Sequence, residues 1–281
     1  MNSGYRFLKQ YIGPVKAVIL DWSGTTADKY VLAPAVVFVD VFKKNGVPIT
    51  MKEARVPMGL RKDLHIKALT EMPEIRRRWI EIKGREPNQC DVDNLFKDFV
   101  PLQLACLRKY TELIPGTAHT ARQLRNDFHV KIGHTTGFFS SMVDILLADA
   151  RKQGYVPDAS VAGDDVIHGA RPKPFMVYRN MDILDVHPIQ AVVKVDDTVS
   201  GVGEALEAGC WGVGVAKYSN YMEVDSLDAI GKMSPEEESR KIKKTRDLLI
   251  QSGAYYVIDS IVDLPEVIED INQRLKRGEN P

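Results

Sequence analysis

Six short apolar runs, with helix-like segments between most of them, constrain the fold more than any other feature of the chain. The runs cover residues 15–20, 130–133, 159–162, 191–195, 212–215 and 255–258. Short apolar runs that alternate with segments of helical period, such as 118–126 and 141–153, are typical of buried strands in a parallel sheet. We therefore predict an α/β fold, a doubly wound Rossmann-like parallel sheet covered by helices.

The distance between the first two runs predicts an inserted domain. Roughly a hundred residues without a convincing strand separate residue 20 from residue 130, far more than a βαβ crossover needs. Helical patterns fill this interval, at residues 35–45, 52–54, 62–70, 74–83 and 91–109. We expect residues 1–29 and 112–281 to form the α/β core domain and residues 30–111 to form a small helical cap domain.

Composition argues against several classes of protein. The 38 basic and 38 acidic side chains balance, so the chain offers no electrostatic footprint for nucleic acid or for an anionic membrane. Cys90, Cys106 and Cys210 are far apart and odd in number, which indicates a reducing compartment and no cysteine metal cluster. No signal-peptide pattern opens the sequence, and a proline and an aspartate break its longest apolar stretch. We expect a cytoplasmic protein that binds neither nucleic acid nor membrane.

Chemically useful side chains follow several of the predicted strands. Asp21 opens the segment DWSGTT after the first run, and later runs lead to GHTTG (133–137), ARPKP (170–174) and VDDT (195–198). The carboxyl ends of parallel strands meet at one edge of a sheet, where anionic ligands bind. A carboxylate that attacks phosphorus needs a hydroxyl, a fixed cation and acids that hold Mg²⁺. Thr136, Arg171 and Asp197 supply these groups in that order, although Thr136 could instead cap a strand end and Asp197 could belong to a turn.

The four segments resemble the four signature motifs of the haloacid dehalogenase superfamily, and the insertion resembles the small helical cap of that superfamily. PMGLRK (57–62) and ALTEMP (68–73), taken with DWSGTT, resemble the phosphonoacetaldehyde hydrolase (phosphonatase) family. This likeness runs from about residue 15 to residue 216. It implies Mg²⁺-dependent hydrolysis of the C–P bond of a small-molecule phosphonate, phosphonoacetaldehyde, to acetaldehyde and phosphate. It also implies a homodimer.

The resemblance assigns a role to nine side chains. The implied catalytic residues are Asp21, Lys62, His65, Thr136 and Arg171, the implied substrate contacts are Met58, Ser23 and Gly137, and the implied metal ligands are Asp21, Ser23 and Asp197. Asp21 would attack phosphorus, Lys62 would form an imine with the aldehyde, and His65 would carry protons during imine formation. The alternative for Lys62 is an ordinary surface lysine, and for His65 a structural hydrogen-bonding group.

Ser23 and Lys62 together favour cleavage of a C–P bond over cleavage of an ester. Phosphatases of the superfamily carry a second aspartate two residues after the nucleophile, where this chain has Ser23, and a serine hydroxyl is too weak an acid to protonate an alcohol leaving group. A C–P bond leaves no oxygen to protonate, whereas a protonated imine at Lys62 would accept the electrons of the breaking bond. A free lysine amine titrates near ~10.4, so its pKa must be depressed, and we expect Met58 to cover it.

Four positions depart from the pattern of the family. Gly201 stands where a second acid is usual, and Asp196 stands where a glycine is usual. Phe138 replaces a tyrosine and Val31 replaces a cysteine. Three hypotheses stay open: a phosphonoacetaldehyde hydrolase, a related phosphohydrolase that acts on another phosphonate or on a phosphate ester, and a binding homologue with little catalysis.

Overall fold

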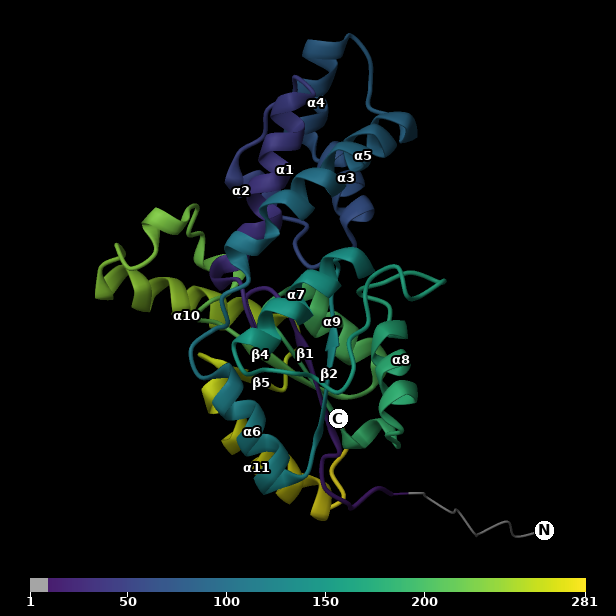
Figure 1. Cartoon of the computed structure of the whole chain (residues 1–281), viewed down its shortest axis with the longest axis vertical. Coiled ribbons are helices and arrows are strands. Elements are labelled where there is room, and N and C mark those ends of the chain that lie inside the picture. Colours follow the sequence, from purple (N-terminus) through teal and green to yellow (C-terminus); the bar gives the residue numbers. More distant parts are fainter. Residues whose placement is uncertain (1–9) are drawn as a thin grey trace, which may run out of the picture.

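The computed structural model of the chain describes residues 10–281 and shows a parallel sheet between two layers of helices, with a group of further helices at one end (Figure 1). The strands are β1 (Ala17–Asp21), β2 (Lys131–Thr135), β3 (Val192–Asp196), β4 (Trp211–Val215) and β5 (Tyr256–Ile258). Their order is β2-β1-β3-β4-β5, and every neighbouring pair is parallel. The prediction of a doubly wound α/β core is confirmed.

The position of β1 decides where a ligand can bind. All residues of β1, β3 and β4 are buried, as expected for strands that helices cover on both faces. From β1 the chain continues to β2 on one side, while β3 lies on the other side, so the strand order reverses at β1. Such a switch point leaves a crevice at the carboxyl end of the strand, and Asp21 is the last residue of β1.

The expectation of a strand at residues 159–162 is wrong. This segment lies beside β2, where His134 donates its N–H to Ala159 O and Val161 donates its N–H to His134 O. Only an isolated bridge between Thr135 and Val161 results. The chain then leaves the sheet, because the Asp165 carboxylate accepts the N–H of Ala162 and so closes a turn directly after the bridge.

Six helices cover the sheet. They are α6 (Thr117–Phe128), α7 (Ser140–Lys152), α8 (Phe175–Leu184), α9 (Val199–Ala208), α10 (Pro235–Gln251) and α11 (Leu264–Lys276). α8 and α9 pack against each other and bury one set of strand side chains, which includes Ile19, while α6 and α11 pack together over the opposite set, which includes Val18 and Leu20 (Figure 1). Successive side chains of β1 point to opposite faces of the sheet, so they pack into two separate apolar layers.

Five helices inserted between β1 and β2 form the cap. They are α1 (Leu32–Lys44), α2 (Met51–Arg55), α3 (Lys62–Glu71), α4 (Pro73–Lys83) and α5 (Gln89–Cys106). α5 packs against both α1 and α3, and the group stands apart from the sheet in Figure 1. The rings of Phe38 and Phe99 stack with their centroids 4.6 Å apart and join α1 to α5. The buried apolar side chains of these helices, Phe38 and Phe99 among them, are continuous with the apolar layer that contains Val18 and Leu20 of β1.

Short 3₁₀ helices complete the architecture. They are η1 (Lys29–Val31), η2 (Leu107–Tyr110), η3 (Ile189–Ala191), η4 (Asn220–Met222), η5 (Leu227–Ala229) and η6 (Ile261–Asp263). η1 and η2 lie where the chain passes into and out of the group of cap helices. Within residues 10–281, no helix combines the length and the apolar character that crossing a bilayer requires.

Candidate active site

A small cavity of about 20 Å³ lies where the cap meets the carboxyl ends of β1, β2 and β3. Eight of the nine side chains singled out in the sequence line it, namely Asp21, Ser23, Met58, Lys62, Thr136, Gly137, Arg171 and Asp197. The ninth, His65, does not. Segments that are more than a hundred residues apart in the sequence thus meet around one space. A volume of this size holds about one water molecule, so a substrate must enter with the cap displaced.

Asp21 lies against a fixed cation. Arg171 donates from Nη2 to Asp21 Oδ1 at 2.6 Å and to the hydroxyl of Thr135 at 2.7 Å. The Nε of Arg171 also donates to Glu204 Oε2 at 3.0 Å. Held at these points, the guanidinium has one orientation beside Asp21, where it can stabilise charge on a phosphoryl oxygen.

Thr136 and Gly137 shape the floor of the cavity after β2. The hydroxyl oxygen of Thr136 accepts the N–H of Phe138 at 3.1 Å, which leaves the hydroxyl proton free to be donated to a ligand. A Cβ atom added at Gly137 would lie 2.4 Å from the backbone oxygen of Leu60, in the cap. Any side chain at position 137 would therefore push the cap away from the core.

Lys62 brings an amine from the cap into the cavity. It is the first residue of α3 and is 4 % exposed. Burial lowers the pKa of Lys62 from its ordinary value near 10.5 to about 8, against the opposing influence of the Asp21 carboxylate. Met58 is as buried as Lys62 and lines the same cavity, and the expected cover of the amine by this side chain stays a prediction. Lys62 Nζ also lies 4.6 Å from the centroid of the Phe138 ring.

His65 lies behind Lys62, inside the cap. Its Nε2 is 2.9 Å from Ala54 O, and its ring stacks on Phe38 with centroids 3.8 Å apart. Nε2 must carry the proton to donate to a carbonyl, so Nδ1 is unprotonated, and it has no partner within residues 10–281. Burial lowers the pKa of His65 well below its usual value. The ring therefore fixes α3 against α1 and α2, and its role in proton transfer stays a prediction.

Three aspartates offer a site for a hard cation. Asp21, Asp196 and Asp197 each place one carboxylate oxygen so that all three oxygens lie within 4.8 Å of one another. Asp197 Oδ1 is buried and has no hydrogen-bond partner in the described part of the chain. Burial, together with the Asp196 and Asp21 carboxylates, raises the pKa of Asp197 well above its usual range. A divalent cation would reverse this effect, because it favours the charged form of every acid around it.

The charge balance of the site also fits a divalent cation. Four buried acids of the core, Asp21, Asp196, Asp197 and Glu204, face two buried cations of the core, Arg171 and Lys194, among residues 10–281. With all four acids ionised, two negative charges would be left over before the cap lysine is counted, and uncompensated buried charge is costly. Oxygen ligands and a deficit of two positive charges match Mg²⁺.

Asp196 and Gly201, the two departures from the family pattern near the segment VDDT (195–198), are structurally related. A Cβ atom added at Gly201 would lie 1.8 Å from Cγ of Asp196, so the Asp196 carboxylate occupies the space of a side chain at position 201. Both oxygens of Asp196 are engaged, Oδ1 with the N–H and hydroxyl of Thr198 and Oδ2 with Lys194 Nζ at 2.7 Å. The chain therefore keeps a carboxylate in this space but supplies it from the strand instead of the helix.

Sequence reasoning missed two charged residues beneath the site. Lys194 lies within β3 and is fully buried, and Glu204 lies within α9 and accepts hydrogen bonds from Arg171 and Thr135. The run VVKVD could have indicated a buried charged group, because a lysine inside a buried strand requires an acid nearby. Glu204 has no such signal, since a glutamate in a helix is ordinary.

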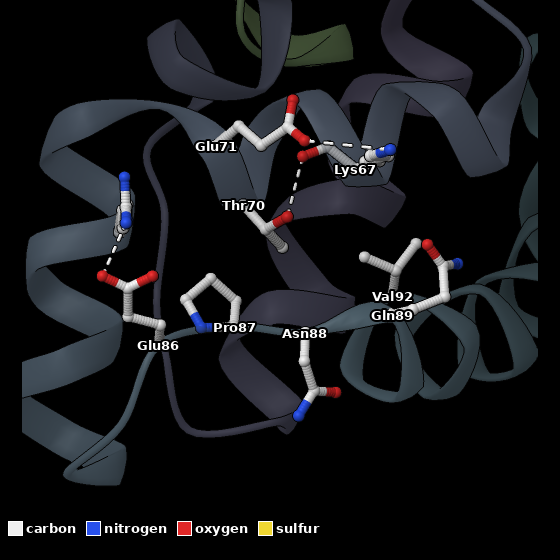
Figure 2. A pocket seen from close by; sticks show the side chains of 9 residues that line it. Lys67, Thr70, Glu71, Glu86, Pro87, Asn88, Gln89 and Val92 are labelled. Atoms are coloured by element: carbon white, nitrogen blue, oxygen red, sulfur yellow. Dashed lines mark hydrogen bonds and ion pairs between the residues drawn. The ribbon is translucent and has the colours of Figure 1, made fainter.

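A larger cleft of about 420 Å³ lies in the cap, among α3, α4 and the segment that leads into α5 (Figure 2). Its charged side chains pair with one another, Arg76 with Glu86 and Lys67 with Glu71. Figure 2 shows the pair of Lys67 and Glu71 on one helix, and Glu86 with Pro87 beside it on the segment that leads into α5. Because the charges are satisfied on an open rim, this cleft presents no convergent set of reactive groups.

Comparisons with known proteins agree with this geometry. No family profile matches the chain. A phosphonoacetaldehyde hydrolase of Syntrophobacter fumaroxidans is 42 % identical over 276 residues, which is 97 % of this chain and 98 % of that protein. The chain belongs to the phosphonoacetaldehyde hydrolase family. The crystal structure of a phosphonoacetaldehyde hydrolase-like protein from Oleispira antarctica superimposes with a TM-score of 0.94 at 38 % identity and covers 99 % of both chains.

A more distant structure places the family within a wider fold. A HAD family hydrolase from Deinococcus radiodurans, solved with bound phosphate and sodium, superimposes with a TM-score of 0.57 at 19 % identity. The match covers 92 % of this chain and 97 % of that one. At this identity the likeness concerns the fold, which is the haloacid dehalogenase fold expected from the four motifs.

Proposed function

We propose that the protein is an enzyme that hydrolyses the C–P bond of phosphonoacetaldehyde and releases acetaldehyde and phosphate. One observation carries the proposal: an amine from the cap, Lys62, and a carboxylate from the core, Asp21, line the same small cavity. The relatives that bear the name of this activity support it.

In the first step, the neutral amine of Lys62 adds to the aldehyde carbon, and uptake of one proton with loss of water gives a protonated imine. The pKa of Lys62, near 8, raises the share of neutral amine at neutral pH by roughly two orders of magnitude over an ordinary lysine. The side chain enters from the edge of a cap whose interior is apolar, so the amine is shielded from water before the aldehyde arrives.

In the second step, Asp21 attacks phosphorus and the C–P bond breaks. The electron pair of that bond moves into the protonated imine, which becomes a neutral enamine, and an aspartyl phosphate forms on Asp21. Arg171, already hydrogen-bonded to Asp21, and the hydroxyl of Thr136 are placed to stabilise the phosphoryl oxygens.

In the third step, water returns both side chains to their starting forms. One water molecule cleaves the aspartyl phosphate and releases phosphate, and protonation of the enamine carbon followed by addition of a second water releases acetaldehyde from Lys62. The water lost in the first step balances one of these, so the net reaction consumes one water molecule. The cap must open between turnovers, because the cavity of about 20 Å³ has room for only about one water molecule.

Mg²⁺ belongs to this proposal as the cofactor. Asp21 and Asp197 would hold it together with the backbone or side chain of Ser23, and Asp196 lies within the same group of oxygens. When bound, the ion would supply positive charge to the phosphonate oxygens. A homodimer, a cytoplasmic location and domain boundaries at residues 30 and 111 are further parts of the proposal.

Product analysis tests the proposal. We expect the unchanged protein with Mg²⁺ to release acetaldehyde and phosphate in equal amounts from phosphonoacetaldehyde, and Lys62→Ala and Asp21→Ala each to lose more than about a thousandfold in kcat/KM. Lys67→Ala is the matched control, because Lys67 lies on the same helix and is exposed. It should retain full activity.

The two rival hypotheses predict different results. An enzyme for phosphate esters would turn over an ester faster than the phosphonate and would not be impaired by Lys62→Ala. A binding homologue would release neither product and would not take up beryllium fluoride with Mg²⁺. Either result would replace the proposal.

A further inference from the structure

A buried arginine at the base of the cap lies outside the cavity and outside the steps above. Arg55 is the last residue of α2 and is 4 % exposed. Its Nη1 donates to Tyr30 O at 2.7 Å and to Asn220 Oδ1 at 3.1 Å, and its Nη2 donates to Val224 O at 2.5 Å. One side chain of the cap is thus bound both to the start of the cap and to a loop of the core.

Asn220 continues this connection to the site. Its Nδ2 returns a hydrogen bond to Arg55 O at 3.0 Å, so Arg55 and Asn220 bind each other in both directions. The backbone N–H of Asn220 donates to Asp197 Oδ2 at 2.8 Å, and the hydroxyl of neighbouring Ser219 donates to Asp197 O at 2.9 Å. A single residue therefore separates the cap arginine from an acid of the cavity.

The chain between the core and the cap is held in an unusual conformation at the same place. Tyr30 and Val31 have φ angles of 67° and 56°. A β-branched residue such as Val31 is rare in this left-handed region and persists only where surrounding contacts enforce it. Arg55 binds the carbonyl of Tyr30, and Val31 lines the cavity. Arg55 therefore also holds the turn from which the cap departs.

The partners of Arg55 indicate a positioning role. Most of them are carbonyl oxygens, and the one carboxylate among its partners within residues 10–281, that of Asp225, lies 3.3 Å from Nε and is 57 % exposed. A buried cation with such partners adds little net stability, because the loss of hydration offsets the hydrogen bonds. It does fix geometry, since a planar guanidinium binds several acceptors only in one arrangement.

We propose that Arg55 is a positioning residue that joins the base of the cap to Asn220. Through this contact it would couple the burial of Lys62 in the cavity to the position of the Asp197 carboxylate. The inference rests on the proposed roles of Lys62 and Asp197, but its test needs no turnover. Arg55 itself touches neither the cavity nor the reacting groups.

Two measurements on the full-length protein test the coupling. The first is the rate at which an amine-acylating reagent labels Lys62 at pH 8, followed by peptide mapping. The second is the affinity for Mg²⁺, measured by titration calorimetry without substrate. For Arg55→Ala we expect labelling of Lys62 to rise by about fivefold or more and the Mg²⁺ affinity to fall by about fivefold or more, a coupling of ordinary size.

Arg78→Ala is the matched control. Arg78 is also a cap arginine, but its hydrogen bonds to Pro48 O and Glu53 lie wholly within the cap. Both readouts should stay within twofold of the unchanged protein. Arg55→Lys retains the charge without the planar fork, so both readouts should lie between those of the unchanged protein and Arg55→Ala.

Asn220→Ala removes the same contact from the side of the core. It tests the coupling even if Arg55→Ala does not fold. It removes the Asn220 Oδ1 and Nδ2 contacts with Arg55 but leaves the N–H that binds Asp197. We expect both readouts to move in the same directions as in Arg55→Ala, and the double variant to change little beyond the larger single effect.

The proposal is overturned if the Arg55 and Asn220 variants change only one readout, change neither, or add independently in the double variant. It is also overturned if the unchanged protein does not bind Mg²⁺. Changed readouts in a protein that does not cleave phosphonoacetaldehyde would refute the proposed function and leave the coupling intact, so the two failures are distinguishable.

Discussion

Burial shifts the pKa values of the two side chains that we propose to react, Asp21 and Lys62, toward neutral pH from opposite directions. Removal from water raises the pKa of Asp21 to about 6, although Arg171 opposes the shift, and lowers the pKa of Lys62 to about 8. Between these values most of Asp21 is ionised while a useful fraction of Lys62 is neutral. A carboxylate and an amine can therefore both act as nucleophiles at one pH.

The pH dependence of kcat/KM follows from Lys62. Below pH 8 the amine is protonated in the folded protein, so kcat/KM should fall about tenfold for each unit between pH 8 and pH 6, and above pH 8 it should level off. The measurement is a pH profile with phosphonoacetaldehyde at saturating Mg²⁺. A rise that continues to about pH 10.4, the pKa of an exposed lysine, would show that the cap does not bury the amine.

This chain carries an acid at position 196 and a glycine at position 201, whereas the family pattern has the reverse. This arrangement predicts how two variants should behave. Gly201→Asp alone would place its Cβ atom 1.8 Å from Cγ of Asp196 and add a second carboxylate beside the first, so we expect it to lower the free energy of unfolding by about 2 kcal/mol or more. Adding Asp196→Gly should recover most of that loss, and Mg²⁺ binding with it. Chemical denaturation checks the prediction, and a double variant no more stable than Gly201→Asp would contradict it.

At the scale of elements, the cap segment before α3 fits onto the loop after β2 without room for a side chain. A Cβ at position 137 meets the backbone of Leu60, which cannot rotate away. Gly137→Ala should therefore lower kcat/KM by tenfold or more while changing the free energy of unfolding by about 1 kcal/mol or less, because the core behind it is untouched. Kinetics and thermal denaturation together provide the measurement.

Gly203→Ala is the control for that substitution. Gly203 lies within α9, where an added Cβ would make only an ordinary contact of 3.4 Å with Pro172. Alanine favours a helix over glycine by up to about 1 kcal/mol, so this variant should be as active as the unchanged protein and at least as stable. Equal losses of activity in both variants would show that Gly137 has no special place under the cap.

The elements differ in how far the sequence predicts them. β1 and α3 are predicted well, because a continuous apolar run and a regular helical pattern both reflect burial against neighbours along their whole length. Residues 159–162 look like a buried strand and are buried, yet they form one bridge, because a turn closed by Asp165 ends the pairing. That contact involves a side chain outside the apolar run, which a pattern of hydrophobicity does not report.

At the scale of the whole molecule, the fold collects more negative than positive charge beneath the cap, and metal binding should therefore stabilise it. A ligand at a hundred times its Kd adds about 2.7 kcal/mol to the free energy of unfolding. We expect Mg²⁺ at such a concentration to raise the melting temperature of the unchanged protein and a chelator to reverse the rise. Asp197→Asn, which removes the acid with a free Oδ1, should lose most of the response.

The site as a whole was predictable where the chemistry is local to a motif. Asp21, Thr136, Arg171 and Asp197 follow from residues near strand ends, and Lys62 follows from the cap segment that resembles the family. Glu204 and Arg55 were not predictable, because each is an ordinary residue of a helix until the fold brings its partners to it. Charge networks that support a site arise from tertiary contacts, and a single sequence does not record them.

The central claim is that a cap amine and a core carboxylate act on one substrate, and trapping of the imine tests it most directly. The protein is treated with borohydride in the presence of phosphonoacetaldehyde, and the reduced adduct is located by peptide mapping. The account predicts one adduct, on Lys62, which also forms in Asp21→Ala although phosphate release is lost. An adduct on another lysine, or none under conditions of turnover, would contradict the account.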